Sequence, residues 1–301
     1  MVYTVTFNPA LDYALLTDTV AIGETNRSHD EYILTGGKGI NVSTMLCNLG
    51  VENTALGFIG GFTGQEIKKR TEKNGCKTDF IEVPGLSRIN VKIKSNEETE
   101  INASGPLITE NHIAKLIEKI KQLKSCDWLV LAGSVSKNIP DSVYAEIMKN
   151  TPDGVKIVVD ATGNILLNAI KQNPFMVKPN HFELSDITGE KLGNDRDKVL
   201  FHAHKLRQMG AENVLVSLAG NGAVLSGKDN VSLQADAPVG NVLDSVGAGD
   251  SMVAGFIYGY IESGNLEHAF KMGIASGSAS AFSKGFATKA DILKIYDSIK
   301  L

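Results

Sequence analysis

The residues with the clearest chemistry form one short stretch near the C-terminus, Asn241–Ser251. Apolar residues follow it at helical spacing, which predicts a helix that begins at its glycines. The N–H groups of a helix's first turn have no partners inside the helix and carry the positive end of its dipole. Gly247, Ala248 and Gly249 would let an anion approach those groups closely, and Asp250 would add a carboxylate. A base beside an anion cradle is the arrangement that phosphoryl transfer to a hydroxyl requires.

A second glycine-rich stretch, Thr35–Asn41, also leads into a predicted helix. It can present backbone N–H groups and the Lys38 ammonium to an anion or a polyol, or it can be a flexible turn. Gly39 follows Lys38 where a P-loop has Ser or Thr, and Met252 stands where the dinucleotide fingerprint has its third glycine. These departures argue against a P-loop protein and against a nicotinamide-dependent oxidoreductase.

Other candidate side chains lie at strand ends or in loops, and each has a structural alternative. Asp12 follows the first predicted strand, where its carboxylate could hold sugar hydroxyls or cap a helix. Arg27 and Arg88 have the guanidinium geometry for a phosphate, or they could be solvated. Asn180 and Glu183 could hold water on Mg²⁺ near phosphates, or they could begin a helix.

Small residues give two further candidates for contact with a nucleotide. Ser217–Ala223 is a glycine-bearing turn that could lie against a nucleotide or could be a plain hairpin. Gly277–Ala279 allows close approach either by an adenine ring or by a neighbouring helix, and helix packing is the favoured interpretation.

Alternating strand and helix patterns must position these residues. Strands are predicted at Tyr3–Phe7, Thr54–Ile59, Trp128–Ala132, Val155–Val159 and Asn213–Ser217. Helices are predicted at Ile40–Leu49, Gln65–Asn74, Asn111–Leu123 and Lys198–Met209. This alternation predicts an α/β fold with a mostly parallel sheet covered by helices on both faces. Ligands in such folds bind at the carboxyl ends of the strands.

Two segments break this rhythm, because Leu15–Leu34 and Arg88–Asn102 carry short extended stretches with no helix between them. In the second segment Ile89, Val91 and Ile93 alternate with polar residues, as in a strand with one apolar face. We predict a small antiparallel sheet that projects from the core. A projecting sheet with apolar residues needs a partner, so it could be a lid, a dimer surface or both.

Composition limits the class of protein. The chain has 301 residues, 43% of them hydrophobic, and a net charge of −4, so no basic surface argues for nucleic acid or an anionic membrane. No apolar run approaches the roughly 20 residues that span a bilayer. Met1–Phe7 is typical of a strand rather than a signal peptide, and we expect a cytoplasmic location. Cys47, Cys76 and Cys126 are far apart in the sequence and are interpreted as small buried residues.

Three of these stretches together resemble the signatures of ribokinase-like (PfkB) sugar kinases: Gly36–Val42, Lys178–Glu183 and Ser245–Ser251. The resemblance extends along the whole chain in order. Within the family it is greatest to members that phosphorylate fructose 1-phosphate and next to those that act on tagatose 6-phosphate. The stretches that favour the first group are Gly57–Gly64, Arg88–Lys92, Thr99–Asn102 and Ala281–Gly285.

The resemblance implies a single domain over residues 1–301, with a three-layer α/β/α core and a β lid formed by about 12–34 and 87–103. It implies phosphorylation of fructose 1-phosphate to fructose 1,6-bisphosphate by ATP with Mg²⁺, and a homodimer paired through the lid. Asp250 would be the catalytic base, with Gly247, Ala248 and Gly249 as the anion hole. The sugar phosphate would contact Asp12, Arg27, Gly36, Gly37, Lys38, Asn41, Arg88 and Asn90. The nucleotide would contact Asn180, Ser217, Gly220, Gly222 and Ser278, and Glu183 would hold the metal through water.

An ordinary aspartate has a pKa of about 4, so Asp250 would accept the hydroxyl proton late rather than remove it in advance. The chain departs from the family in two places, at Gly133–Asn138 and at Ala219. If Ala219 needs a positive φ, the alanine costs about 1 kcal/mol. These departures leave open a sensor that binds sugar phosphate or nucleotide without catalysis, beside the tagatose-6-phosphate kinase alternative.

Overall fold

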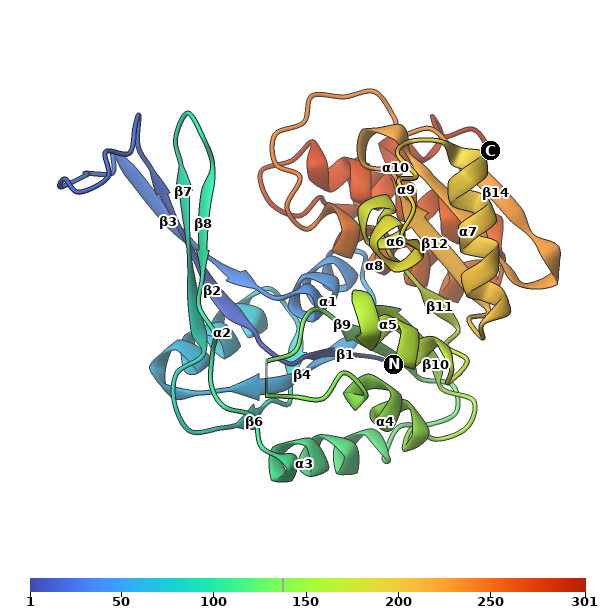
Figure 1. Ribbon diagram of the computed structural model, residues 1–301, viewed down its shortest axis with the longest axis horizontal. Coiled ribbons are helices and arrows are strands. Elements are labelled where there is room, and N and C mark those ends of the chain that lie inside the picture. The colour runs from blue at the N-terminus through green and yellow to red at the C-terminus, as the bar shows by residue number, and fades with distance from the viewer. Residues whose placement is uncertain (137) are drawn as a thin grey trace.

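A large sheet runs through the molecule, and helices cover both of its faces (Figure 1). The computed structural model describes residues 1–136 and 138–301. Neighbouring strands follow the order β14 (Ser232–Ala235), β13 (Ala223–Ser226), β12 (Asn213–Ser217), β11 (Met176–Val177), β10 (Lys156–Asp160), β9 (Trp128–Ala132), β1 (Val2–Thr6), β4 (Asn53–Ile59) and β5 (Lys77–Thr78), and β6 (Ile81–Glu82) also pairs with β4. Only the β12–β13 and β13–β14 pairs are antiparallel among the described pairs of this sheet. The predicted α/β fold with a mostly parallel sheet is therefore confirmed.

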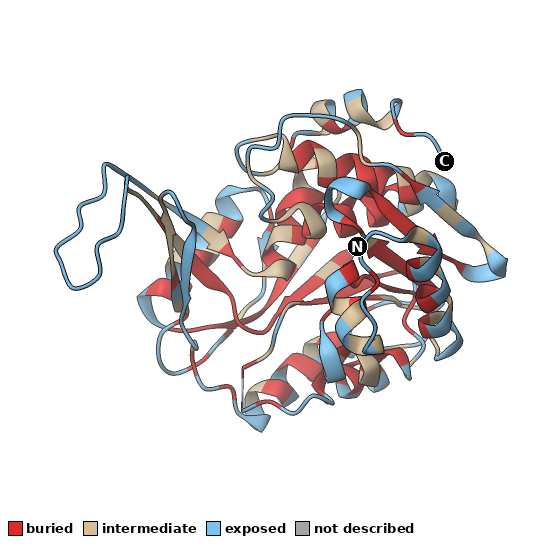
Figure 2. Cartoon of the chain, turned by 45° about the horizontal axis from the view of Figure 1, so that its top comes forward, coloured by how far each residue is buried: buried red, intermediate tan, exposed pale blue. Residues whose placement is uncertain are grey.

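The two faces of the sheet carry separate hydrophobic clusters. One cluster lies under α3 (Glu110–Ile120), α4 (Val143–Lys149), α5 (Gly163–Ile170), α6 (His181–Thr188) and α7 (Arg196–Gln208). The other lies under α1 (Lys38–Asn48), α8 (Ala248–Ser263), α9 (Leu266–Ala281) and α10 (Lys289–Tyr296). In β9 Leu129 and Leu131 belong to the first cluster, and Trp128 and Val130 belong to the second. This alternation is the two-residue period of a strand buried on both faces, and Figure 2 shows the resulting buried centre.

The predicted strands and helices are present, with small shifts at their ends. The largest shift is in α2 (Gly61–Lys73), which begins four residues before the predicted Gln65. Glycine is a poor helix former, so Gly61 and Gly64 hid this first turn. A Cβ on Gly64 would lie 2.9 Å from the Cβ of Ile59, so the glycine lets α2 pack closely against the end of β4.

A second sheet projects from the core, on the left of Figure 1. Its order is β3 (Asp30–Gly36), β2 (Ala10–Leu16), β7 (Arg88–Lys94) and β8 (Thr99–Asn102). The prediction of an antiparallel sheet is wrong for its central pair, because β2 and β7 run parallel. Each of them follows a core strand, β1 or β6, so both run out of the core in the same direction.

Apolar side chains of this projecting sheet stay uncovered within one chain. Leu34 on β3 is 50% exposed and Ile101 on β8 is 60% exposed. Figure 2 shows the sheet mainly in the colours of exposed and intermediate residues. An apolar surface of this kind is typical of a protein contact.

No helix in the described ranges combines the length and apolar character that crossing a membrane would need.

Candidate active site

The glycine-rich stretch near the C-terminus forms the start of α8, as the sequence predicts. Gly247 is the N-cap and has a φ of 78°, in the left-handed region that favours glycine. A Cβ at this position would also lie 2.8 Å from the ring of Phe286. Asp250 lies in the first turn of α8 and is only 6% exposed. The structure therefore places the positive end of a helix dipole beside a buried carboxylate, and the Ala248 N–H donates to the Ser245 carbonyl at 3.2 Å.

Asp250 is held by Asn41 from α1, whose Nδ2 donates to the Asp250 Oδ2 at 2.8 Å. Burial, strengthened by the nearby Asp160 charge, raises the pKa of Asp250 to about 7, although Lys38, Asn41 and Lys178 oppose the shift. The ordinary value of about 4 expected from the sequence is therefore wrong. Since a base works best with a pKa near the working pH, this shift makes Asp250 a stronger proton acceptor.

A buried ion cluster lies beside Asp250. The Asp160 carboxylate at the end of β10 is fully buried, with Oδ1 2.9 Å from the Lys38 Nζ and Oδ2 3.5 Å from the Lys178 Nζ. Burial alone would raise the pKa of Asp160, but Lys178 and Lys38 lower it below its usual value. Burial opposes the charge on Lys38, but Asp160, Glu183 and Asp250 raise its pKa overall. Asp160 and Lys38 therefore stabilise each other's charged forms.

The sequence analysis missed Asp160 and gave Lys178 no role. Asp160 is the last residue of a buried strand, at the carboxyl end where ligands of parallel sheets bind. Its position at a strand end could therefore have identified Asp160 as a candidate site residue. Its partners lie 122 residues before it and 18 residues after it, and nothing in the sequence pairs them.

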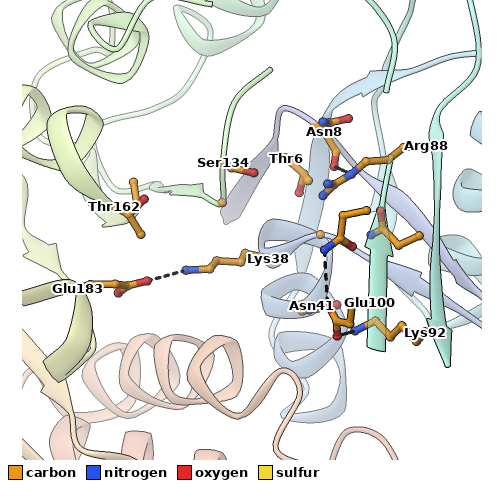
Figure 3. A pocket seen from close by; sticks show the side chains of 15 residues that line it. Thr6, Asn8, Lys38, Asn41, Arg88, Lys92, Glu100, Ser134, Thr162 and Glu183 are labelled. Atoms are coloured by element: carbon orange, nitrogen blue, oxygen red, sulfur yellow. Dashed lines mark hydrogen bonds and ion pairs between the residues drawn. The ribbon is translucent and has the colours of Figure 1, made fainter. Parts of the chain in front are cut away.

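A cleft of about 450 Å³ opens between the strand ends of the core and the projecting sheet. Of the predicted site residues, it is lined by Gly37, Lys38, Asn41, Arg88, Asn90 and Glu183. Its other lining residues were not predicted: Thr6, Asn8, Lys92, Glu100, Asn102, Gly133, Ser134, Ala161 and Thr162. Figure 3 shows Lys38 extending toward Glu183 from one side and Arg88 and Lys92 on the other. Cations on opposite sides suit a ligand with more than one phosphate group.

The projecting sheet gives the cleft one ordered polar wall. Asp12 on β2 accepts a hydrogen bond of 2.8 Å from the Asn90 Nδ2 on β7. The Lys92 Nζ lies 3.7 Å from Asp12 and 3.1 Å from Glu100. Any Cβ on Gly36 would lie 2.6 Å from the Asp12 carboxylate oxygens, so the glycine makes room for this group. The predicted Asp12, Gly36 and Asn90 thus lie together.

The two predicted phosphate-binding arginines have different surroundings. Arg88 is partly buried at the cleft, and its Nε donates to the Asn8 carbonyl at 3.1 Å. Burial lowers the pKa of Arg88 and the Asp12 charge opposes that change. Arg27 is exposed in the loop between β2 and β3 and does not line the cleft. Of these two arginines, only Arg88 therefore lies at the predicted substrate site within a single chain.

Asn180 and Glu183 form a capping box at the start of α6, which was the structural alternative for this pair. The Glu183 N–H donates to the Asn180 Oδ1, and the Asn180 N–H donates to the Glu183 Oε2, both at 2.8 Å. The other Glu183 oxygen, Oε1, lies 3.8 Å from the Lys38 Nζ. Glu183 thus both caps a helix and lines the cleft.

The other predicted nucleotide residues lie outside the lining of this cleft. Ser217 bridges to Asn180 at the next strand end. Gly220 and Gly222 belong to the turn after β12, and Ser278 lies in α9. Within the described residues, no three His, Cys, Asp or Glu side chains form a cluster that could ligate a metal.

The two departures from the family pattern fall at this edge of the sheet. Gly133 and Ser134 line the cleft, and Lys137 lies outside the described residues. Ala219 has a φ of 50°, so the alanine does adopt a left-handed conformation.

We expect Ala219→Gly to raise the free energy of unfolding by about 0.5 kcal/mol. Left-handed backbone costs alanine roughly 1–2 kcal/mol, and the greater freedom of glycine in the unfolded chain offsets part of that gain. Urea denaturation of both proteins measures the difference. The control is Ala114→Gly at an exposed position of α3, which should lose about 1 kcal/mol. Equal losses in both variants would contradict the conformational argument.

Comparison with known proteins agrees with this geometry. Residues 6–293 match the family described as pfkB family carbohydrate kinase. The 1-phosphofructokinase of Bacillus subtilis is 41% identical, with 100% of this chain and 99% of the relative covered. The D-tagatose-1-phosphate kinase of Bacillus licheniformis is 37% identical, with 95% and 94% covered. The phosphofructokinase-2 structure from Escherichia coli is 28% identical, has a TM-score of 0.92, and covers 99% of this chain and 98% of its own. This chain belongs to the pfkB family of carbohydrate kinases, as predicted.

Proposed function

We propose that this protein transfers the γ-phosphoryl group of ATP to fructose 1-phosphate and so produces fructose 1,6-bisphosphate. The observation that carries the proposal is the Asp250 carboxylate, buried in the first turn of α8 with a pKa of about 7. Asn41, which donates a hydrogen bond to Asp250, lines a cleft that also presents Lys38, Arg88 and Lys92. The full-length similarity to 1-phosphofructokinases supports the choice of substrate.

In this proposal each group has a role that its position allows. Asp250 orients the reacting hydroxyl and accepts its proton as the new P–O bond forms. The N–H groups at the start of α8 and the Lys38 ammonium stabilise the negative charge of the transferred group. Arg88 and Lys92, at the lid side of the cleft, bind the phosphate that the sugar already carries. Most of the rate then comes from positioning and charge stabilisation.

Mg²⁺ fits this site as an ion held by nucleotide phosphates and water. Glu183 lines the cleft, but one of its oxygens accepts the Asn180 N–H and the other faces Lys38. Magnesium commonly keeps several waters and uses one or two carboxylates together with substrate phosphates. We propose that Glu183 holds the ion through water, beside a nucleotide placed by Asn180, Ser217, Gly220, Gly222 and Ser278. When bound, the ion neutralises phosphate charge.

The test is ADP release by the purified protein with MgATP and one sugar phosphate at a time. Fructose 1-phosphate is expected to give the highest kcat/KM. Tagatose 1-phosphate must be included because a similar relative is named for it, and tagatose 6-phosphate and fructose 6-phosphate complete the set. A preference for another sugar phosphate would keep the mechanism and change the substrate. Measurable ATP binding without turnover on any of them would favour the sensor alternative.

We also propose that the projecting sheet is a lid and that pairing of two lids makes a homodimer. The exposed Leu34 and Ile101 support a contact of this kind. Arg27 would bind the sugar phosphate only if the loop between β2 and β3 moves onto a cleft. A cytoplasmic location is consistent with an enzyme that uses ATP and a phosphorylated sugar.

The lid is tied to the loop before α8 by an ion pair. The Lys94 Nζ at the end of β7 lies 3.3 Å from the Asp244 Oδ2, and the Asp244 Oδ1 accepts the Val246 N–H at 2.9 Å. We expect Lys94→Met to lower kcat/KM for the sugar phosphate up to about fivefold, since partly exposed pairs contribute about 0–1 kcal/mol. Steady-state kinetics at low and high salt measures this. Lys121→Met, which removes a surface pair on α3, should change nothing, and an unchanged Lys94→Met would mean that the pair has no role in closure.

A further inference from the structure

Two cysteines that are far apart in the sequence meet at the opposite end of α1 from the cleft. The Sγ atoms of Cys47, in the last turn of α1, and Cys76, after α2, lie 2.9 Å apart. A disulfide bond is about 2.0 Å long, so the two sulfurs are already within 1 Å of bonding distance. The interpretation of the cysteines as small buried residues holds for Cys76, whereas Cys47 is only partly covered and Cys126 is exposed.

The surroundings give the two thiols different properties. Cys76 is buried, with 4% exposure, whereas Cys47 is only partly covered. The hydrogen-bonded contact with Cys76 lowers the pKa of the Cys47 thiol to about 7, and a 3.1 Å hydrogen bond from the Asn53 Nδ2 adds to that effect against burial. The same contact with Cys47, together with burial, raises the pKa of Cys76. Cys47 is thus the accessible nucleophile and Cys76 its buried neighbour.

We propose that Cys47 and Cys76 form a peroxide-reactive dithiol site that closes to an intramolecular disulfide. The Cys47 thiolate attacks one oxygen of the hydroperoxide, the O–O bond breaks, and the leaving oxygen takes a proton. Cys47 is then a sulfenic acid. The Cys76 sulfur attacks the Cys47 sulfur, the S–O bond breaks, and the departing hydroxide leaves as water with the Cys76 proton. Two thiols are oxidised to one disulfide, and hydrogen peroxide is reduced to two waters.

The backbone around the pair allows the sulfurs to approach. Cys76 follows Gly75, which ends the α2 region with a φ of 88° and has open space around its Cα. Cys47 lies in the last turn of α1, where helix ends fray. Lys38 is nine residues earlier on α1, about 13 Å along the helix axis. The bond would therefore form away from the cleft and would restrain the chain between α1 and β5.

The experiment compares the protein before and after hydrogen peroxide, with free thiols then alkylated and the intact mass and peptides measured. The oxidised chain should lose the mass of two hydrogen atoms and retain one of its three alkylatable thiols, that of Cys126. The peptides of Cys47 and Cys76 should be joined, and dithiothreitol should restore both thiols. The temperature of unfolding should be higher for the oxidised than for the reduced protein.

Three variants make the result specific, and thermal unfolding under reducing conditions checks that each one folds. Cys126→Ser is the matched control and should form the disulfide as the parent protein does. Cys76→Ser should stop at a Cys47 sulfenic acid that dimedone traps, and Cys47→Ser should not react at these positions. The proposal is overturned if both thiols remain alkylatable after peroxide, or if the disulfide that forms joins two chains through Cys126.

Discussion

Replacement of Asp250 by asparagine is expected to lower kcat at least about 100-fold, the low end of a general base's contribution. Asparagine keeps the size of the side chain, and its carbonyl oxygen can accept the hydrogen bond that Asn41 now donates to the carboxylate. Binding of ATP and sugar phosphate should therefore persist. Steady-state kinetics and equilibrium binding measure the two quantities separately. Asp186→Asn on the exposed side of α6 is the control and should keep full activity.

The pH dependence adds a second readout to the same variant. Burial raises the pKa of Asp250 to about 7 in the folded protein, above its value in the unfolded chain. The stability that this group contributes is therefore fully present below the unfolded pKa and is lost as pH rises through about 7. An asparagine side chain cannot ionise. Between the unfolded pKa of about 4 and the folded pKa of about 7, Asp250→Asn should therefore gain stability relative to the parent protein by about 1.4 kcal/mol per pH unit.

The pH profile of kcat should also depend on Asp250, but kcat should rise over the pH range in which stability falls. Asp250 accepts a proton only when ionised, so kcat of the parent protein should rise with pH up to about 7 and then level off. Near-normal turnover by the variant, or a stability difference that does not change with pH, would remove Asp250 from the role of base.

Asp160→Asn should have the largest effect on stability, a loss of about 3–5 kcal/mol, because it leaves the buried Lys178 and the partly buried Lys38 without their common counter-ion. Lys38 and Lys178 both lie within ion-pair distance of this fully buried carboxylate. Urea denaturation at neutral pH measures the loss. The comparison is Asp79→Asn, whose exposed pair with Lys119 should contribute less than about 1 kcal/mol.

The same substitution should move the pH profile of the enzyme. The Asp160 charge is one of the causes that raise the pKa of Asp250, and the two released lysines would lower it further. The rise of kcat should therefore occur at lower pH in Asp160→Asn than in the parent protein. A stable variant with an unchanged profile would show that the cluster does not act on Asp250.

The fold and the glycine-rich parts of the site could be predicted because they depend on local signals. Strand and helix periods placed β9 and β12 at their observed bounds, and small residues before an apolar helical pattern marked the start of α8. Alternation of apolar and polar residues marked β7 of the projecting sheet, but nothing in the sequence showed its parallel pairing with β2. Pairing between two strands that are far apart in the sequence leaves no pattern in the residues of either strand.

What could not be predicted depends on contacts between distant parts of the chain. The raised pKa of Asp250 results from burial under other elements and from Asp160, and neither can be seen around residue 250. In the sequence Lys92 is only one of several polar residues of a strand, and the folded chain alone brings it to Asp12 and Glu100. Ala219 is an intermediate case. The sequence analysis stated only what a positive φ at Ala219 would cost, and the structure shows that its φ is positive.

The parallel pairing of β2 with β7 has a consequence for how the protein assembles. It joins Ala10 to Arg88 and Asp12 to Asn90, and α1, β4 and α2 all lie between the two strands in sequence. A contact of such long range closes a large loop, which is slow and entropically unfavourable until the intervening elements have folded. The polar wall of the cleft, which depends on this pairing, is therefore expected to form late in folding. During refolding, the ability to bind sugar phosphate should return after the core has regained its secondary structure.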